Sequence, residues 1–177
     1  MSTNHPLTLF RFCPRCGSER FVEYNTKAKL CRQCGFQYYN NSSAAVAAFI
    51  LSPNGQELLF CTRAKNPNKG SLDLTGGFVD EKETAEEAIC REIKEELNLD
   101  VTKVNYLFSL PNLYVYSDFT VHTLDFFFLV EVDNLDIMKC ADDVSEAQFI
   151  PFKQIDINTI GLQSVKKAVN KFLIERM

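Results

Sequence analysis

GGFVDEKETAEEAICREIKEEL, residues 76 to 97, carries eight acidic side chains in twenty-two positions and predicts a helix in its second half. Thr84 followed three residues later by Glu87 is a capping box, so we expect a helix to begin at Thr84. Apolar residues recur after it at helical spacing and mark its buried side: Ala85, Ala88, Ile89 and Ile93. Acidic residues disfavour a helix C-terminus, where the macrodipole is already negative, so the glutamates crowded into REIKEE need a physical reason.

Three glutamates near the end of this helix fall where its apolar side should be. At roughly 100° per residue, Glu92 and Glu96 lie on the same side of the helix as Ala85, and Glu95 lies within about 100° of both around the helix axis. Burying like charges together is costly unless a cation lies among them, and Mg²⁺, which prefers oxygen ligands, would resolve the conflict. The alternative is a solvated acidic face, but solvated glutamates should lie opposite the alanines, as Glu87 does.

The same stretch resembles the Nudix box, the motif of a family of hydrolases. The positions that carry the resemblance are Gly77-x5-Glu83-x7-Arg91-Glu92-Ile93-x-Glu95-Glu96-x-Asn98-Leu99. The family's glycine after the double glutamate is Asn98 here, and asparagine is the usual substitute for glycine in the left-handed conformation that ends a helix. Residues 61–79, CTRAKNPNKGSLDLTGGFV, are also similar to the family's lead-in strand and loop, with Thr75 where a proline is common.

The resemblance implies a Nudix pyrophosphohydrolase that uses Mg²⁺ or Mn²⁺ and acts on a nucleoside diphosphate linked to another moiety. A pyrophosphate is polyanionic, so an acidic site binds it only through bridging cations, which also orient the P–O–P link and generate hydroxide near neutral pH. Water then attacks one phosphorus and releases two phosphate monoesters. The implied metal ligands are Glu92, Glu95 and Glu96, with the carbonyl of Gly77 and the carboxylate of Glu83 as further members of the set.

The resemblance also assigns roles in catalysis. Arg91 would pair with a neighbouring glutamate and fix the geometry of helix and loop, so the predicted catalytic residues are Arg91, Glu92, Glu95 and Glu96. The general base varies across the family and stays open here. The candidates are Glu95 and three acids of the loop ADDVSEA at 141–147: Asp142, Asp143 and Glu146.

The N-terminal segment carries a second motif. Cys13-x2-Cys16 and Cys31-x2-Cys34, with fourteen residues between the pairs, match a four-cysteine zinc site. Four protein ligands leave no open position, so the zinc would be structural, replacing a core that a segment this short cannot build. A disulfide framework is the alternative, and the lack of a secretion signal disfavours it.

Charge and polarity divide the chain at one place. Residues 1–40 hold six basic and two acidic side chains, a balance of +4, so the net charge of −4 leaves −8 for the remaining 137 residues. The polar stretch NNSS at 40–43 lies at this change. We therefore predict a zinc ribbon over 1–40 and a Nudix hydrolase domain over 41–177.

Beyond the boundary, strand-like and helix-like patterns alternate. The expected helices are 84–97 and 163–175, and the expected strands are 44–51, 57–63, 71–79, 104–110, 122–132 and 147–152. Asn-Gly at 54 and 55 predicts a hairpin between the first two strands. The fold class is an α/β (α+β) sandwich of the Nudix type, with a mixed β-sheet between helices.

The order of zinc ribbon and Nudix domain resembles the NADH pyrophosphatase branch of the family, which carries SQPWPFPxS after the box. Here SLPNLYVYS at 109–117 keeps Ser109, Pro111 and Ser117, with Tyr114 where an aromatic residue is expected, and the chain has no tryptophan. The implied substrates are ADP-ribose and NADH or NAD. Tyr114 and Tyr116 either stack on a base or pack against the core, and Arg63 in the lead-in stretch is a further candidate substrate contact.

Composition bounds the partners and the location. No run of about 18 apolar residues exists, so no membrane span is expected. The N-terminal residues lack a basic segment followed by a long apolar one, so no signal peptide is expected and the predicted location is the cytoplasm. A net charge of −4 argues against a general nucleic-acid binder, and a small-molecule nucleotide is the expected partner. Many relatives of this kind are dimers, which makes a homodimer a candidate assembly.

Two other functions stay open at this point. One is a module that senses a nucleotide without cleaving it, although a sensor would not need all the glutamates of the box. The other is removal of a nucleotide cap from RNA, with the basic ribbon holding the strand. Aromatic residues that interleave with the basic ones would suit that role, or would form the ribbon's small core: Phe12, Phe21, Tyr24, Phe36, Tyr38 and Tyr39.

Overall fold

The chain forms two compact units, the first ending at Ser42 and the second beginning at Ser43. The structure is a computed structural model that describes residues 5–116 and 119–176, apart from the side chain of Tyr116. No helix within these described ranges is long and apolar enough to cross a membrane.

The N-terminal unit is a small antiparallel sheet beside the cysteines. Its strands, in sheet order, are β1 (Phe21–Asn25), β2 (Ala28–Cys31) and β3 (Gln37–Tyr39). Its main core cluster is formed by three buried residues, Cys13, Phe21 and Cys31, with Cys34 and Phe36 packed against it. Leu7 and Ala28 are buried as well. So little apolar packing cannot hold a fold by itself, which is consistent with a unit built around a bound metal.

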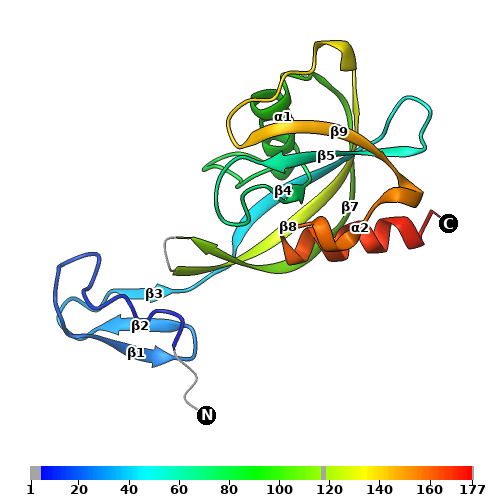
Figure 1. Ribbon diagram of the computed structural model, residues 1–177. Coiled ribbons are helices and arrows are strands. Elements are labelled where there is room, and N and C mark those ends of the chain that lie inside the picture. The colour runs from blue at the N-terminus through cyan, green and yellow to red at the C-terminus, as the bar shows by residue number, and fades with distance from the viewer. Residues whose placement is uncertain (1–4, 117–118, 177) are drawn as a thin grey trace. The chain divides into compact units, whose positions relative to one another are not determined.

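The second unit contains two three-stranded sheets (Figure 1). The first has the order β4 (Ser43–Ile50), β8 (Phe119–Val132) and β7 (Val101–Tyr116). The second has the order β6 (Leu72–Asp73), β5 (Glu57–Arg63) and β9 (Val144–Pro151). β4 pairs with β8 in parallel and every other pair is antiparallel, so the predicted mixed sheet is confirmed.

Two helices cover the strands, α1 (Ala85–Leu97) and α2 (Gln163–Ile174). Alternate residues of β4 point to different cores because successive side chains of a strand face opposite sides. Val46 packs in the cluster that contains Ile89 of α1, whereas Phe49 packs in the cluster that contains Phe172 of α2. The rings of Phe49 and Phe172 stack with centroids 4.2 Å apart. The predicted sandwich, with strands between helices, is therefore confirmed. Three short 3₁₀ segments complete the unit: η1 (Leu135–Ile137), η2 (Phe152–Gln154) and η3 (Ile157–Thr159).

The ends of α1 are as the sequence predicts. Thr84 is the N-cap, and its side chain and that of Glu87 form both hydrogen bonds of the capping box. Asn98 ends the helix in the left-handed conformation, with φ 56° and ψ 27°. These caps fix where the glutamates of the helix lie along its axis.

The hairpin predicted at Asn54 and Gly55 is confirmed only for the residues next to the turn. A tight turn is present, closed by the hydrogen bond from the Gly55 N–H to the Ser52 carbonyl at 2.8 Å. An antiparallel bridge between Leu51 and Leu58 and a hydrogen bond from the Ser52 N–H to the Glu57 carbonyl at 3.1 Å follow, and the two strands then join different sheets. The free edge of β4 is instead occupied by residues 75–79, which exchange backbone hydrogen bonds with it. The predicted strand at 71–79 is therefore divided: Leu72–Asp73 form β6 beside β5, and residues 75–79 lie along β4.

Candidate active site

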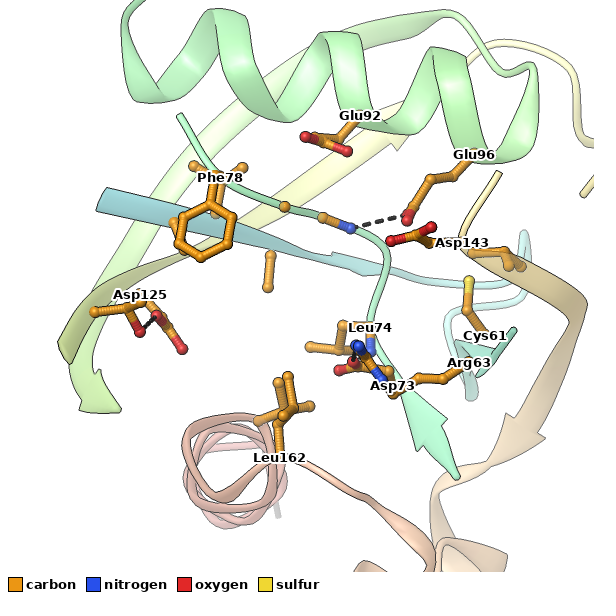
Figure 2. Close-up of a pocket in the computed structure, with 18 of the residues that line it drawn as sticks. Cys61, Arg63, Asp73, Leu74, Phe78, Glu92, Glu96, Asp125, Asp143 and Leu162 are labelled. Atoms are coloured by element: carbon orange, nitrogen blue, oxygen red, sulfur yellow. Dashed lines mark hydrogen bonds and ion pairs between the residues drawn. The ribbon is translucent and has the colours of Figure 1, made fainter. Parts of the chain in front are cut away.

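A cavity of about 530 Å³ lies where α1, the 73–78 segment and both sheets meet. Figure 2 shows Glu92 and Glu96 of α1 on one side of it, Asp125 and Leu162 on another, and Arg63 with Asp73 on a third. This volume is in the range of pockets that hold small ligands. Residues distant in the sequence therefore share one site.

Glu96 is the most deeply buried acid of the helix, with 6% of its surface exposed. Its Oε2 accepts hydrogen bonds from the Thr75 hydroxyl at 2.6 Å and from the Gly76 N–H at 3.1 Å. Burial raises the pKa of Glu96 to about 7, although these hydrogen bonds act in the opposite direction. A proline at position 75 would lack the hydroxyl, so Thr75 gives this chain a contact to Glu96 that sequence reasoning did not predict.

Arg91 holds three glutamates at once. Its Nε and Nη2 donate to the two carboxylate oxygens of Glu83 at 2.9 and 3.0 Å, a bidentate pair. Its Nη1 donates to Glu92 at 2.8 Å and to Glu95 at 3.2 Å, and Nη2 also reaches the Phe78 carbonyl at 3.0 Å. The guanidinium therefore ties the helix to the loop before it, as the resemblance implies for an arginine in this position.

The box glutamates differ in exposure. The side chain of Glu92 is 14% exposed and that of Glu95 is 50% exposed. Burial raises the pKa of Glu92 even though Arg91 lowers it. Because one guanidinium faces the carboxylates of Glu83, Glu92 and Glu95, with Asp80 at 3.9 Å, negative charge is in excess at this end of the cavity. This set of hard oxygen donors fits Mg²⁺ or Mn²⁺.

Gly77 is required by a close approach. Its carbonyl accepts a hydrogen bond from the Val46 N–H at 2.8 Å, which places the loop against β4. A Cβ built on Gly77 would collide with the carboxylate of Glu92. Any larger residue would therefore displace that carboxylate from the cavity.

The predicted substrate contacts differ in whether they line the cavity and in whether other protein groups already occupy them. Arg63 lines the cavity, but its Nη1 donates to Asp73 at 2.6 Å and its Nε donates to the Pro67 carbonyl at 2.8 Å. Tyr114 lines the cavity too, with its hydroxyl 3.4 Å from Arg63 Nη2 and its ring edge-on to Phe78 at 5.8 Å. The side chain of Tyr116 lies outside the described residues.

Two of the three loop acids reach the cavity. Asp142 and Asp143 line it, and both form ion pairs with Lys65, at 2.7 Å for Asp142. Hydrogen bonding by Lys65 lowers the pKa of Asp142. Glu146 is exposed on β9 and is not part of the cavity lining.

Sequence reasoning missed two buried acids of the cavity, Asp73 and Asp125, each 6% exposed. Burial raises the pKa of Asp73 despite its pairing with Arg63. Both follow apolar strand residues, and no local motif marks them. An acid within an apolar strand, as in LDFFFLV for Asp125, is the signal that could have found them.

The four predicted zinc ligands gather in the N-terminal unit. The Sγ atoms of Cys13, Cys16, Cys31 and Cys34 all lie within 4.8 Å of one another. The Sγ atoms of Cys13 and Cys34 are 3.7 Å apart, and so are those of Cys16 and Cys31. Four thiolates about 2.3 Å from a common zinc would be about 3.8 Å apart, so the cluster fits a zinc ribbon. All seven cysteines are free, which contradicts the disulfide alternative.

Comparison with known proteins gives consistent results. Residues 42–171 match the NUDIX domain family. The NAD-capped RNA hydrolase NudC of Vibrio vulnificus is 29% identical over 107 residues, 60% of this chain and 40% of that protein. The same-named protein of Stutzerimonas stutzeri is 25% identical and covers 93% of this chain, and the chain spans about half the length of such relatives. The crystal structure of a NUDIX hydrolase from Nitrosomonas europaea has the same fold, with a TM-score of 0.70 at 22% identity over 94% of this chain and 92% of that one.

Proposed function

Since the chain belongs to the NUDIX domain family, we propose that it is a metal-dependent hydrolase that cleaves the pyrophosphate of a nucleoside diphosphate linked to another moiety. The observation that carries the proposal is the cluster of box glutamates around one guanidinium at the edge of a cavity of about 530 Å³. In this proposal residues 1–40 are a zinc ribbon and residues 41–177 are the hydrolase domain.

Mg²⁺ or Mn²⁺ would be held by Glu92, Glu95 and Glu96, with the Gly77 carbonyl and Glu83 as further ligands, and would supply the positive charge that a pyrophosphate needs here. Arg91 keeps Glu92 and Glu83 in place through its hydrogen bonds at 2.8 to 3.0 Å.

Glu95 is the proposed general base because its half-exposed carboxylate can reach a water molecule at the mouth of the cavity. The water oxygen bonds to one phosphorus, its proton passes to the base, and the P–O bond of the anhydride breaks to give two phosphate monoesters. Asp143 is the alternative base, since it lines the same cavity.

The proposed substrates are ADP-ribose and NADH or NAD. The relatives named NAD-capped RNA hydrolase support a substrate that contains an adenine dinucleotide. The rings of Phe78 and Tyr114 at the cavity support a flat base as part of the ligand. Stacking on one aromatic ring is worth about 1 to 3 kcal/mol per base.

A screen tests this proposal. ADP-ribose, NADH, NAD, diadenosine polyphosphates, nucleotide sugars and nucleoside triphosphates would be incubated with Mg²⁺ or Mn²⁺, and nucleotide release would be measured. We expect AMP from an adenine dinucleotide or ADP-linked sugar. A nucleoside triphosphate or non-adenine sugar cleaved at least about tenfold more efficiently, a gap of about 1.4 kcal/mol in transition-state binding, would contradict the proposed substrate. Failure to cleave any member would favour a nucleotide sensor.

RNA is a second candidate substrate because of the surface of the N-terminal unit. Phe12 is 56% exposed and Tyr24 is 54% exposed, while Phe10 and Tyr38 stack at 6.1 Å. By contrast Phe21 is buried in the ribbon core. Aromatic residues on a basic unit suit single-stranded RNA. A salt-dependent gel shift with single-stranded RNA, weakened in Phe12→Ala, would support this role, and salt-independent or absent binding would contradict it.

A further inference from the structure

A buried carboxylate lies in the cavity apart from the box glutamates. Asp125 of β8 is 6% exposed and lines the cavity on the side of α2 (Figure 2). Its two oxygens accept hydrogen bonds from the Thr123 and Ser164 hydroxyls, each at 2.5 Å. Asp73, the other buried acid outside the box, has Arg63 as an ion-pair partner. Asp125 has no such partner among the residues that the structure describes.

The strand register builds a compartment in front of Asp125. Asn112 of β7 lies opposite Thr123, and Ala45 of β4 lies opposite Asp125, so all four side chains are on one face of the sheet. The small side chain of Ala45 leaves space above β4. Leu74, Leu162 and Val165 supply apolar walls.

Asn112 adds a second polar group to this compartment. It is 8% exposed and lines the cavity. Its side-chain amide makes no hydrogen bond within residues 5–116 and 119–176, and neither of its polar atoms is sealed off from the cavity, so its donors and its acceptor can meet a ligand there.

The chemistry of these groups selects a ligand. A carboxylate only accepts hydrogen bonds, and each Asp125 oxygen still has a lone pair beyond the one used by a hydroxyl. Asp125 can therefore accept a hydrogen bond from an N–H of the ligand. The amide of Asn112 can donate a hydrogen bond to an acceptor atom of the ligand next to that N–H. A flat group with apolar faces and a donor next to an acceptor at its edge fits this compartment, and adenine is such a group, with an amino group beside a ring nitrogen.

We propose that Asp125, with Asn112, is a specificity-determining site that accepts an N–H from the edge of an amino-bearing base such as adenine. This inference rests on the proposed function, because it takes the base to belong to the nucleotide whose pyrophosphate reaches Glu92 and Glu96. Asp125 does not take part in bond cleavage. It selects which nucleotide is held.

Two nucleotides that differ only in the amino group test the site. AMP and purine riboside 5′-monophosphate, in which hydrogen replaces the amine, would be titrated into the full-length protein and followed by calorimetry. We expect AMP to bind at least about tenfold more tightly, because the analogue leaves the buried acceptor without a partner. Equal affinities, or no measurable binding of AMP, would overturn the inference. This comparison needs no substitution and does not depend on a variant that folds.

Variants sharpen the test. Asp125→Asn keeps the shape but replaces one acceptor by a donor, so the preference for AMP should fall to less than about threefold. Asp133→Asn, at an exposed position just after β8, is the matched control and should keep the preference. If 2′-deoxyAMP loses affinity while AMP and the analogue bind equally, Asp125 contacts the ribose and the inference is wrong. Discrimination between the nucleotides without hydrolysis of any pyrophosphate would overturn the proposed reaction alone.

Discussion

The cysteines of the first unit and the glutamates of α1 are both sets of candidate metal ligands, yet they are arranged differently. The four Sγ atoms lie within 4.8 Å of one another. Among the described residues the glutamates form no such group, because Arg91 holds Glu92 and Glu95 while Thr75 holds Glu96. Carboxylates that repel one another are separated by protein donors, whereas the thiols have converged.

This difference predicts which unit depends on a metal for its fold. The core cluster of the first unit holds three buried residues, and Leu7 and Ala28 are the other buried apolar residues described there, so without metal it has little to hold it together. The helix that bears the glutamates has a complete capping box and buries Ala88, Ile89 and Ile93. We expect metal removal to unfold the first unit and to leave α1 intact.

The largest expected effect is therefore on the first unit. Protein purified without added zinc should contain one zinc ion per chain, about 2.3 Å from the sulfurs of Cys13, Cys16, Cys31 and Cys34. Removing it, or substituting Cys31→Ser, should unfold this unit, since structural zinc contributes on the order of 10 kcal/mol in small domains. Limited proteolysis with mass spectrometry should find new cleavage before Ser42 and continued protection of α1.

Cys90→Ser is the matched control, as Cys90 lies outside the cluster. Unchanged protection after metal loss, or cysteines oxidised in pairs under reducing conditions, would contradict the zinc assignment.

The next effect concerns turnover. Glu95→Gln and Glu96→Gln should each lower kcat at least about 10²-fold while the fold persists, because losing one ligand of a charge-neutralising site removes roughly 3 kcal/mol of transition-state stabilisation. Steady-state kinetics at limiting Mg²⁺ on the best substrate would measure it. Glu86→Gln is the control, since Glu86 is exposed in the first turn of the same helix. A variant with near wild-type rates would show that its glutamate is not a ligand.

A smaller effect is the pH dependence that the buried Glu96 gives to the free energy of unfolding. Burial raises the pKa of Glu96 from its ordinary 4.5 to about 7, so the folded state binds this proton more tightly than the unfolded state. The contribution of Glu96 to the free energy of unfolding is therefore greatest below pH 4.5 and is lost as pH rises to about 7. With chelator present, the wild type should lose about 2 kcal/mol more than Glu96→Gln between pH 5 and pH 8, measured by denaturant unfolding. Parallel pH curves for the two proteins would show that Glu96 titrates normally.

Local signals made the glutamate helix and the cysteine cluster predictable from the sequence. The capping box at Thr84, the left-handed Asn98 and the cysteine spacing each depend on residues close together in the chain. The position of Glu96 on the apolar side also follows from helical periodicity alone, and it is buried as expected.

Non-local pairing explains what the sequence did not predict. Asn-Gly at 54 and 55 forms its turn, but the 75–79 segment occupies the edge of β4 that a hairpin would need. The contact of Ser164 with Asp125 joins α2 to β8 across 39 positions of the chain, and no local pattern indicates it. The three strands of the first unit are too short for a periodic signal.

The smallest expected effect lies outside both ligand sets, at Tyr114. If its ring stacks on the adenine, Tyr114→Ala should raise KM for adenine substrates about fivefold with kcat nearly unchanged, because stacking contributes about 1 kcal/mol at the lower end of its range. Tyr114→Phe is the matched control: it keeps the ring beside Phe78 and removes only the hydroxyl that lies 3.4 Å from Arg63. We expect the phenylalanine variant to retain the wild-type KM, since Arg63 still has its ion pair with Asp73. An unchanged KM in Tyr114→Ala would place the ring outside the base-binding compartment, whereas equal defects in both variants would assign the effect to the hydroxyl and Arg63 instead of to stacking.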